Sequence, residues 1–309
     1  MIDKYNREIN YARISLTSLC NLRCAYCGQD DGKSQKISVE FYETLIDALD
    51  KLGIRKIRFT GGEPLLYENI IKLVKYTNSF ENIKDIAITT NGVLLDRQLD
   101  ELVESGLTRI NFSLDSIDRK TYASLTGSDK LDGVLENINK AKEYGLKVKV
   151  NAVLLKSVTL ENLEEFLDFG YKNNVPIRFI ELMPFGDNMD YYRDNYLSSE
   201  VLINMLNCKK VPNENNEVAT YYRYDDKYDF GIITPISDHF CERCNRIRIT
   251  SRGNLRLCLH SDNEIDLLQY KGDAKAMYNA IALNIISKPE KHLINEDEFV
   301  KTSMVSIGG

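Results

Sequence analysis

Residues 12–27 are ARISLTSLCNLRCAYC, a strand-like segment followed at once by Cys20, Cys24 and Cys27. From this point to residue 182, strand-like segments alternate with segments of helical periodicity. The strand-like segments are 12–17, 54–60, 83–89, 109–114, 147–154 and 176–182, and the helical ones are 38–53, 68–79, 95–106, 129–145 and 160–173. Successive βα units predict parallel strands joined by right-handed crossovers. We therefore expect an α/β fold built on a barrel of the TIM type, full or partial.

Polar and glycine-rich motifs follow the predicted strands at their carboxyl ends. Gly61-Gly62-Glu63-Pro64 follows the second strand, TTNG follows the third, and Ser113-Leu114-Asp115 ends the fourth. Barrel enzymes place their active sites at this end of the strands. A GxGxxG motif after the first strand is absent, which disfavours a Rossmann fold. The pattern indicates an active site at the carboxyl end of a barrel.

The βα rhythm stops near residue 184, where shorter strand-like pieces and a Tyr-rich stretch begin. This change predicts two domains, a barrel at 1–184 and a smaller one at 185–309. The second region carries its own cysteine triad, Cys241, Cys244 and Cys258, with the spacing C-x2-C-x13-C. Cys208 stands alone, and we expect it to be a half-buried bystander.

Composition limits the class of protein. The 309 residues include 40 Lys and Arg against 46 Asp and Glu, a net charge of −6, and 43% are hydrophobic. These values are typical of a soluble protein, and the acidic balance argues against a nucleic-acid binder. We find no membrane-spanning run and no secretion signal, so we expect a cytoplasmic protein. Seven cysteines in such a protein indicate metal or redox chemistry rather than disulfides.

Three thiolates are one fewer than a closed structural zinc site requires. Each triad is therefore either an incomplete zinc site or the ligand set of a four-iron cluster with one open iron. For the second triad, zinc with Cys208, His239 or His260 as fourth ligand stays possible. In that alternative the protein would be a zinc-stabilised binding protein rather than an enzyme.

The first triad, the aromatic Tyr26 within it, and the GGEP motif resemble the signature of the radical S-adenosylmethionine (radical SAM) superfamily. The resemblance implies a partial (β/α)6 TIM-like barrel of the radical SAM type. It also implies that Cys20, Cys24 and Cys27 hold a 4Fe–4S cluster whose open iron binds S-adenosylmethionine. One-electron reduction would then release a 5′-deoxyadenosyl radical. The protein would supply binding, orientation and exclusion of water.

Four further segments resemble the MoaA-type GTP 3′,8-cyclases of molybdenum cofactor biosynthesis, so that the likeness runs from Arg13 to Gly309. They are RFIELMPFGDN (178–188), TPISDHFCERCNRIRITSRGNLRLCLHSD (234–262), KPEKH (288–292) and MVSIGG (304–309). The likeness implies that the radical removes the C3′ hydrogen of GTP and that the resulting carbon radical attacks C8 of guanine. It also implies a second 4Fe–4S cluster, on Cys241, Cys244 and Cys258, that binds the guanine.

The family's functional positions carry over to this sequence by motif. Contacts to S-adenosylmethionine are implied for Tyr26, Gly62, Glu63, Ser113 and Met183. Contacts to GTP are implied for Arg13, Arg58, Thr89, Lys149, Arg246 and Arg248. Arg246 and Arg248 are also implied in catalysis, together with a Gly308-Gly309 tail that enters the active site. Independently of the resemblance, cations that alternate with apolar residues in buried strands suit a triphosphate.

The sequence departs from the family pattern around the first triad. Ser18-Leu19 replaces the usual Asp-Arg, Gly28-Gln29 replaces Met-Pro, and the following loop is short. These changes leave open a related enzyme that acts on a peptide or another nucleotide. A peptide-modifying enzyme would need more carboxyl-terminal cysteines or an amino-terminal extension, and this chain shows neither.

The family also implies partners. We expect a reduced flavodoxin- or ferredoxin-type electron donor, and a downstream cyclic pyranopterin monophosphate synthase that takes the product. The protein would be a monomer or a homodimer, with no nucleic-acid or membrane partner. Of the histidines, His239 and His260 are candidate donors beside the second triad, whereas we expect His292 to be a surface or packing residue.

Overall fold

The computed structural model describes residues 1–309 except 29–35, 187, 213–217, 293–299 and 309. Six parallel strands form the centre of the molecule and pair in chain order. They are β1 (Tyr11–Ser15), β2 (Lys56–Thr60), β3 (Asp85–Thr90), β4 (Arg109–Ser113), β5 (Lys147–Leu154) and β6 (Ile177–Glu181). Each begins and ends within two residues of the segment predicted from the sequence. The predicted partial barrel is confirmed.

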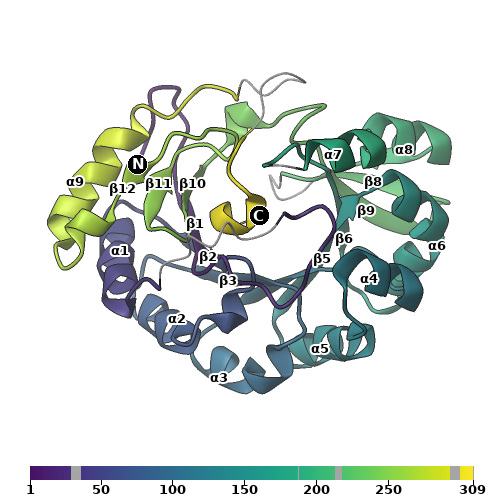
Figure 1. Cartoon of the computed structure of the whole chain (residues 1–309), viewed down its shortest axis with the longest axis horizontal. Helices are drawn as coiled ribbons and strands as arrows, with labels where there is room; N and C mark the ends of the chain where they lie inside the picture. The colour runs from purple at the N-terminus through teal and green to yellow at the C-terminus, as the bar shows by residue number, and fades with distance from the viewer. Residues whose placement is uncertain (29–35, 187, 213–217, 293–299, 309) are drawn as a thin grey trace.

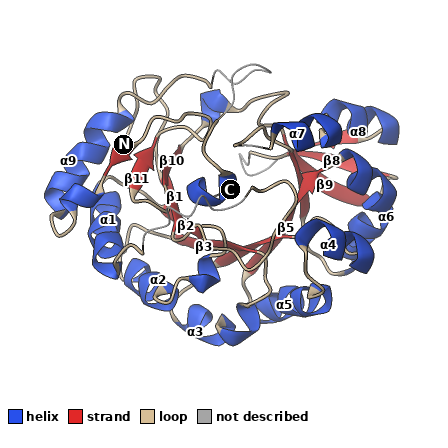
Figure 2. Cartoon of the chain, in the orientation of Figure 1, coloured by secondary structure: helices blue, strands red, loops and turns tan. Residues whose placement is uncertain are grey.

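Helices cover the outer face of these strands (Figures 1 and 2). They are α1 (Val39–Lys51), α2 (Ile70–Asn78), α3 (Leu99–Glu104), α4 (Arg119–Thr126), α5 (Leu131–Glu143) and α6 (Lys156–Lys172). α4 was not predicted, because its sequence, RKTYASLT, has few apolar residues. Its ends are nevertheless well marked. Asp118 accepts a hydrogen bond from the Thr121 N–H, and Gly127 ends the helix in the left-handed conformation.

The carboxyl-terminal region extends both edges of the same sheet instead of forming a sheet of its own. At one edge β9 (Tyr228–Ile233) pairs in parallel with β6, followed by β8 (Thr220–Tyr224) and β7 (Lys209–Val211). At the other, β10 (Arg246–Ile249) pairs in parallel with β1, followed by β11 (Asn254–Arg256) and β12 (Ile265–Asp266). The domain boundary at residue 184 stays a prediction.

The remaining helices lie near the edges of the sheet or inside the barrel. They are α7 (Met189–Asn195), α8 (Ser199–Leu206), α9 (Ala274–Ile285) and α10 (Met304–Ile307), with 3-10 turns η1 (Pro64–Leu66), η2 (Leu95–Arg97), η3 (Cys241–Arg243) and η4 (Leu268–Tyr270). α9 packs on α1, whereas α10 lies in the middle of the ring of strands (Figure 1). No helix in the described ranges is long and apolar enough to span a membrane.

The strands separate an apolar outer face from a polar inner one. In β1, Ala12 and Ile14 are fully buried against the helices, while Tyr11, Arg13 and Ser15 alternate with them and face the barrel interior. Parallel register then repeats this arrangement in neighbouring strands, because Arg13 lies opposite Arg58 of β2 and Arg248 of β10. The sequence pattern of the strands thus lines the barrel with cations.

Candidate active site

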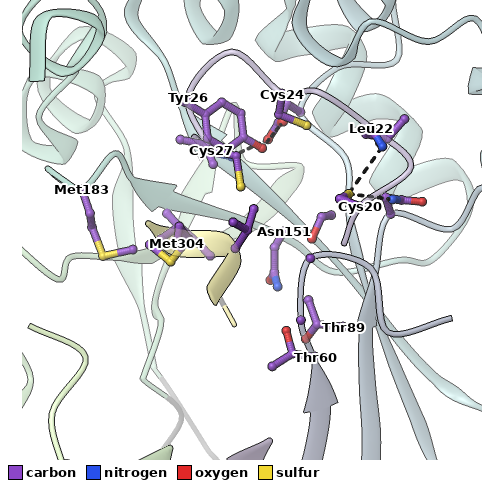
Figure 3. Close-up of a pocket in the computed structure, with 18 of the residues that line it drawn as sticks. Cys20, Leu22, Cys24, Tyr26, Cys27, Thr60, Thr89, Asn151, Met183 and Met304 are labelled. Carbon is purple, nitrogen blue, oxygen red and sulfur yellow. Dashed lines mark hydrogen bonds between the residues drawn. The ribbon is translucent and has the colours of Figure 1, made fainter. Parts of the chain in front are cut away.

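The first cysteine triad lies on the loop that leaves the carboxyl end of β1. Cys20, Cys24 and Cys27 line one cavity at the mouth of the barrel, together with Tyr26 (Figure 3). Figure 3 shows the three cysteines at one end of this cavity and Thr60 and Thr89 below them. All three thiols are free. The loop therefore brings the predicted ligands together around a space deep enough for a bound group.

The GGEP turn is built tightly against this loop. The Gly62 N–H donates to the Thr17 carbonyl at 2.7 Å, and the Glu63 N–H donates to the Leu19 carbonyl at 2.8 Å. A Cβ at Gly62 would lie 2.4 Å from the Leu19 carbonyl oxygen, so no other residue fits without displacing the loop. The glycine is required because the two backbones approach so closely.

Glu63 does not line the cavity in the described structure. Its side chain is fully buried and accepts hydrogen bonds from Thr90 Oγ1 at 2.7 Å, from the Asn91 N–H at 2.8 Å and from the Leu65 N–H at 3.1 Å. Burial raises its pKa to about 7 despite these donors. Its predicted direct contact with the cofactor stays a prediction. What the structure shows is a carboxyl that joins the GGEP turn to the end of β3.

A second carboxyl supports the cysteine loop. Tyr26 donates a hydrogen bond from its hydroxyl to Asp115 Oδ2 at 2.6 Å, and Asp115 Oδ1 accepts another from the Val153 N–H at 2.8 Å. Asp115 is buried, and burial raises its pKa. The sequence indicated that the fourth strand ends in functional residues but did not predict this bond. It ties the loop between Cys24 and Cys27 to strand β5.

The thiols of the first triad lie in surroundings that disfavour the thiolate. Burial raises the pKa of Cys27 to about 12, and the neighbouring Cys20 and Asp115 act in the same direction. Burial, then Asp115, also raise the pKa of Cys24, and burial raises that of Cys20. A cationic group bound among these sulfurs would favour ionisation.

The second triad lines a separate cavity beside β10. Cys241 begins η3, Cys244 follows it, and Cys258 follows β11; all three face the same space. Among the described residues, no three His, Cys, Asp or Glu side chains are placed to hold a single metal ion. In a four-iron cluster each thiolate binds a different iron, so three cysteines need only face one cavity. Both triads satisfy that requirement.

Cations and histidines surround the second triad. Lys288 is only 2% exposed and donates from Nζ to the Leu257 carbonyl. Burial opposes ionisation of Cys244, but Lys288, Arg246 and Arg248 outweigh it and lower the pKa of that thiol. His292, expected at the surface or in packing, packs against His260 and His239 with ring centroids 4.6 and 5.2 Å apart, and lines the cavity with them.

Between the two cavities lies a group of four arginines, of which Arg248 is buried and the others are half-buried. Arg13 and Arg58 line the first cavity, Arg246 and Arg248 line the second, and register places Arg13 beside Arg248. Burial lowers the pKa of Arg248 to about 10, and burial and neighbouring arginines lower those of Arg13 and Arg58. Because these guanidinium groups lie close together, they repel one another and destabilise the free protein. A bound polyanion would relieve the repulsion.

The carboxyl-terminal segment enters the barrel from the side of the second triad. Arg248 donates from a guanidinium nitrogen to the Gly308 carbonyl at 2.9 Å, and the Ser251 N–H donates to the Ser306 carbonyl at 3.0 Å. Gly308 has φ 74°, and a Cβ there would lie 2.5 Å from Thr60. The structure shows the tail as far as Gly308, inside the barrel. Gly309 lies outside the described residues. So does Gln29, one of the residues at which this sequence departs from the family pattern.

Comparison with known proteins identifies the family. A family model described as the radical SAM superfamily matches residues 14–170, and one described as Molybdenum Cofactor Synthesis C matches residues 175–294. Relatives described as GTP 3′,8-cyclase, from Clostridium botulinum and Alkaliphilus oremlandii, are each 40% identical over 100% of this chain and 100% of their own. The chain belongs to the GTP 3′,8-cyclases of the radical SAM superfamily. It is a radical SAM enzyme.

Solved structures agree on the fold. Streptococcus suis SuiB bound to S-adenosylmethionine matches with a TM-score of 0.64 over 98% of this chain and 79% of that one. At 18% identity this likeness shows the fold alone. Membership of the superfamily implies one 4Fe–4S cluster and S-adenosylmethionine, and the residues around the first triad fit both: three free cysteines face one cavity beside the glycine turn.

The predicted contact residues of this radical SAM enzyme fall into three groups. Those that line the first cavity are Tyr26, Gly62, Ser113, Met183, Arg13, Arg58 and Thr89. Those that line the second are Arg246 and Arg248. Lys149 lies on β5 opposite Asn111 and two residues before Asn151, which lines the first cavity. Lys149 is thus on the inner face of the barrel, deeper than the cavity lining.

Sequence reasoning missed several residues of the site. Asp115 was noted only as part of a strand end, and Lys288 only within the KPEKH segment. Tyr11, at the start of β1, was not considered, although it lies among the arginines. A buried position two residues before Arg13, on the same face of the strand, is the signal that could have found it.

Proposed function

We propose that this enzyme converts GTP into its 3′,8-cyclised nucleotide, the first step of molybdenum cofactor biosynthesis. The observation that carries the proposal is the position of Arg13, Arg58, Arg246 and Arg248 between the two cysteine triads. A nucleoside triphosphate has a polyanionic end for these cations and a base that reaches toward the second triad. We also propose that Cys241, Cys244 and Cys258 hold a second 4Fe–4S cluster, whose open iron binds the guanine.

When bound, the first cluster and S-adenosylmethionine would supply a 5′-deoxyadenosyl radical that removes the C3′ hydrogen atom of GTP. The C3′ radical forms a bond to C8 of the same guanine, and the adduct then takes up one electron and one proton. The chain's own residues hold the two reactants. Gly62, Ser113 and Met183 line the cofactor end of the first cavity, and Arg13 and Arg58 hold the phosphates below it.

Arg248 connects the substrate end of the barrel to the tail. Its guanidinium donates to the Gly308 carbonyl, so it has further N–H groups for a phosphate while it fixes the tail across the cavity. The tail excludes water from the space in which the carbon radical forms. Arg248 thus positions substrate and tail together, which supports its predicted role in catalysis, and Arg246 lines the same cavity as Arg248.

The test uses the reconstituted, dithionite-reduced enzyme with S-adenosylmethionine and GTP deuterated at C3′. We expect deuterium in 5′-deoxyadenosine and a cyclised product of triphosphate mass. GTP deuterated at C2′ is the matched control and should transfer none. If 5′-deoxyadenosine forms only with some other substrate, the proposal is wrong. Iron analysis should give roughly eight irons per chain, as two four-iron clusters require; stoichiometric zinc would overturn the second cluster.

The remaining partners are proposed on the same basis. Cys20 is exposed, which offers a flavodoxin- or ferredoxin-type protein a short path for an electron to the first cluster. The cyclised product would pass to a cyclic pyranopterin monophosphate synthase. We propose a cytoplasmic location for the enzyme, since both partners would be cytoplasmic. Measuring 5′-deoxyadenosine formation with each reduced carrier protein in place of dithionite tests the donor.

A further inference from the structure

Tyr11 lies on the inner face of the barrel at the level of the deepest cations. It begins β1, is 6% exposed, and in register lies opposite Arg246 of β10 on one side and Lys56 of β2 on the other. Arg13 follows two residues later on the same face. Tyr11 is therefore an aromatic residue enclosed by basic residues from its own strand and from both neighbouring strands.

The ring of Tyr11 is within cation–π distance of three of these groups. Its centroid is 5.1 Å from Lys56 Nζ, 5.6 Å from Arg58 Cζ and 5.6 Å from Arg246 Cζ. Attraction to the negative face of a ring acts within about 6 Å and is strongest where water is excluded. Burial alone would raise the pKa of the Tyr11 hydroxyl, yet the cations, with Arg58 and Arg13 foremost, lower it to about 8.

The cations differ in how their charge is balanced. Lys56 and Arg109 both pair with Asp85, at 2.7 and 3.1 Å. Arg58 and Arg246 form no ion pair with a carboxylate anywhere in the described part of the chain, and the Nε of each is buried there without a hydrogen-bond partner. A ring stabilises a guanidinium without using its N–H donors, whereas a carboxylate would occupy them. The donors therefore stay available to phosphate oxygens.

We propose that Tyr11 is a positioning residue for the phosphates of GTP: its ring holds Arg58 and Arg246 in place, with their N–H donors unused, before the triphosphate binds. This inference rests on the proposed function. The ring reduces the cost of keeping like charges close in the free enzyme, so less of the binding free energy is spent on arranging them. The hydroxyl is not required for this role.

The test replaces Tyr11 by phenylalanine and by a series of mono-, di- and trifluorinated phenylalanines in the reconstituted enzyme. Fluorination withdraws electron density from the ring and weakens cation–π attraction, with little change of shape. Calorimetry with GTP and with guanosine is the measurement. We expect Tyr11→Phe within about twofold of wild type for both, and a stepwise loss of GTP affinity with fluorination that reaches about tenfold. Guanosine affinity should stay constant throughout.

Two further variants complete the design. Tyr11→Leu removes the ring and should match the trifluorinated enzyme for GTP. Tyr76→Leu is the matched control, because the Tyr76 ring packs against Phe80 on the outside of the barrel and its hydroxyl donates to Asp47; it should bind GTP as wild type does. If Tyr11→Leu fails to fold, the fluorinated series still decides, since it keeps the side-chain volume.

Several results would overturn the inference. A flat fluorination series means that the ring only fills space, and a Tyr11→Phe enzyme as weak as the trifluorinated one means that the hydroxyl binds the phosphate. Equal losses for guanosine and GTP mean a general disordering of the barrel. If instead the wild-type enzyme binds guanosine as tightly as GTP, the barrel has no site for the phosphates, and the proposed function is wrong.

Discussion

The two cysteine triads are chemically alike but lie in opposite electrostatic surroundings. Around the first, burial and the nearby carboxyl groups of Asp115 and Glu63 raise the pKa values of the thiols. Around the second, Lys288, Arg246 and Arg248 lower the pKa of Cys244 in spite of burial. Burial still raises the pKa of Cys241, although Lys288 acts in the opposite direction there too. Both triads lie beside strands of the same sheet. The difference therefore comes from the charged residues that neighbouring segments place beside each triad.

This difference matches the charge of the proposed ligands. S-Adenosylmethionine carries a positive sulfonium and a positive ammonium group, and it would bind at the end of the barrel that has carboxyl groups. GTP is a polyanion, and its phosphates would bind at the end that has arginines. Two neighbouring cavities with opposite electrostatic surroundings would orient the two reactants toward each other before any chemistry occurs.

Replacing one cysteine ligand in each triad should have the largest effect on activity and should affect the two sites differently. Cys24→Ala should abolish cleavage of S-adenosylmethionine, because the cluster that supplies the electron cannot form. Cys258→Ala should keep some uncoupled cleavage but form no cyclised product. Chromatographic measurement of 5′-deoxyadenosine and product, with dithionite as reductant, checks both. Equal loss of both activities in Cys258→Ala would mean that the second triad is structural.

Arg58→Met tests whether the arginines serve the substrate at the expense of stability. Losing a charged hydrogen-bond donor should raise the KM for GTP by about 10- to 100-fold. The melting temperature of the free protein should not fall, because Arg58 is crowded by like charges. Arg58→Lys, which keeps the charge, should lie between the two for KM. A large fall in melting temperature with an unchanged KM would contradict this account.

Glu63 provides a pH test at the carboxyl-rich end. Its pKa in the folded protein, about 7, is above its ordinary 4.5, so the folded state keeps a proton that the unfolded chain has released. Stability from this group is therefore complete below pH 4.5, falls between about pH 4.5 and 7, and is constant above. The wild-type protein should lose roughly 3 kcal/mol relative to Glu63→Gln across that range. Denaturant unfolding at several pH values measures it; a constant difference between the two proteins would refute it.

Cys208→Ala should have the smallest effect. Cys208 follows α8, packs beside the main hydrophobic core and is absent from the residues that line either cavity. Iron content, zinc content and product formation should equal those of wild type, and unfolding should change by less than about 1 kcal/mol. Loss of metal from the second triad in this variant would revive Cys208 as a fourth ligand.

The sequence predicted what local pattern controls. Alternation in the strands located all six barrel strands, and cysteine spacing located both triads. α4 was missed because its polar sequence lacks the apolar stripe by which helices are recognised. The pairing of β10 with β1 and of β9 with β6 leaves no local pattern, so the sequence could not show that carboxyl-terminal strands extend both edges of the barrel sheet.

The same limit of local sequence patterns applies to the candidate site. Residues within motifs were found, but what a side chain faces depends on packing between distant segments. Glu63 belongs to the GGEP motif yet turns toward Thr90 and Asn91 instead of the cavity. Tyr11 and Lys288 are ordinary residues in the sequence, and only the folded barrel places them among the arginines and beside the second triad.

The pairing of β1 with β10 also constrains how the chain folds. Beside these strands, Asn245 donates to Asn10 across 235 residues of sequence. Until residues 246–249 have been synthesised, one edge of β1 has no partner, and an open edge of this kind is prone to pair with other chains. Contacts of such long separation form slowly. We expect the amino-terminal three quarters of the chain to need protection from aggregation during synthesis. The arginines of β1, β2 and β10 should come together only when β10 pairs with β1.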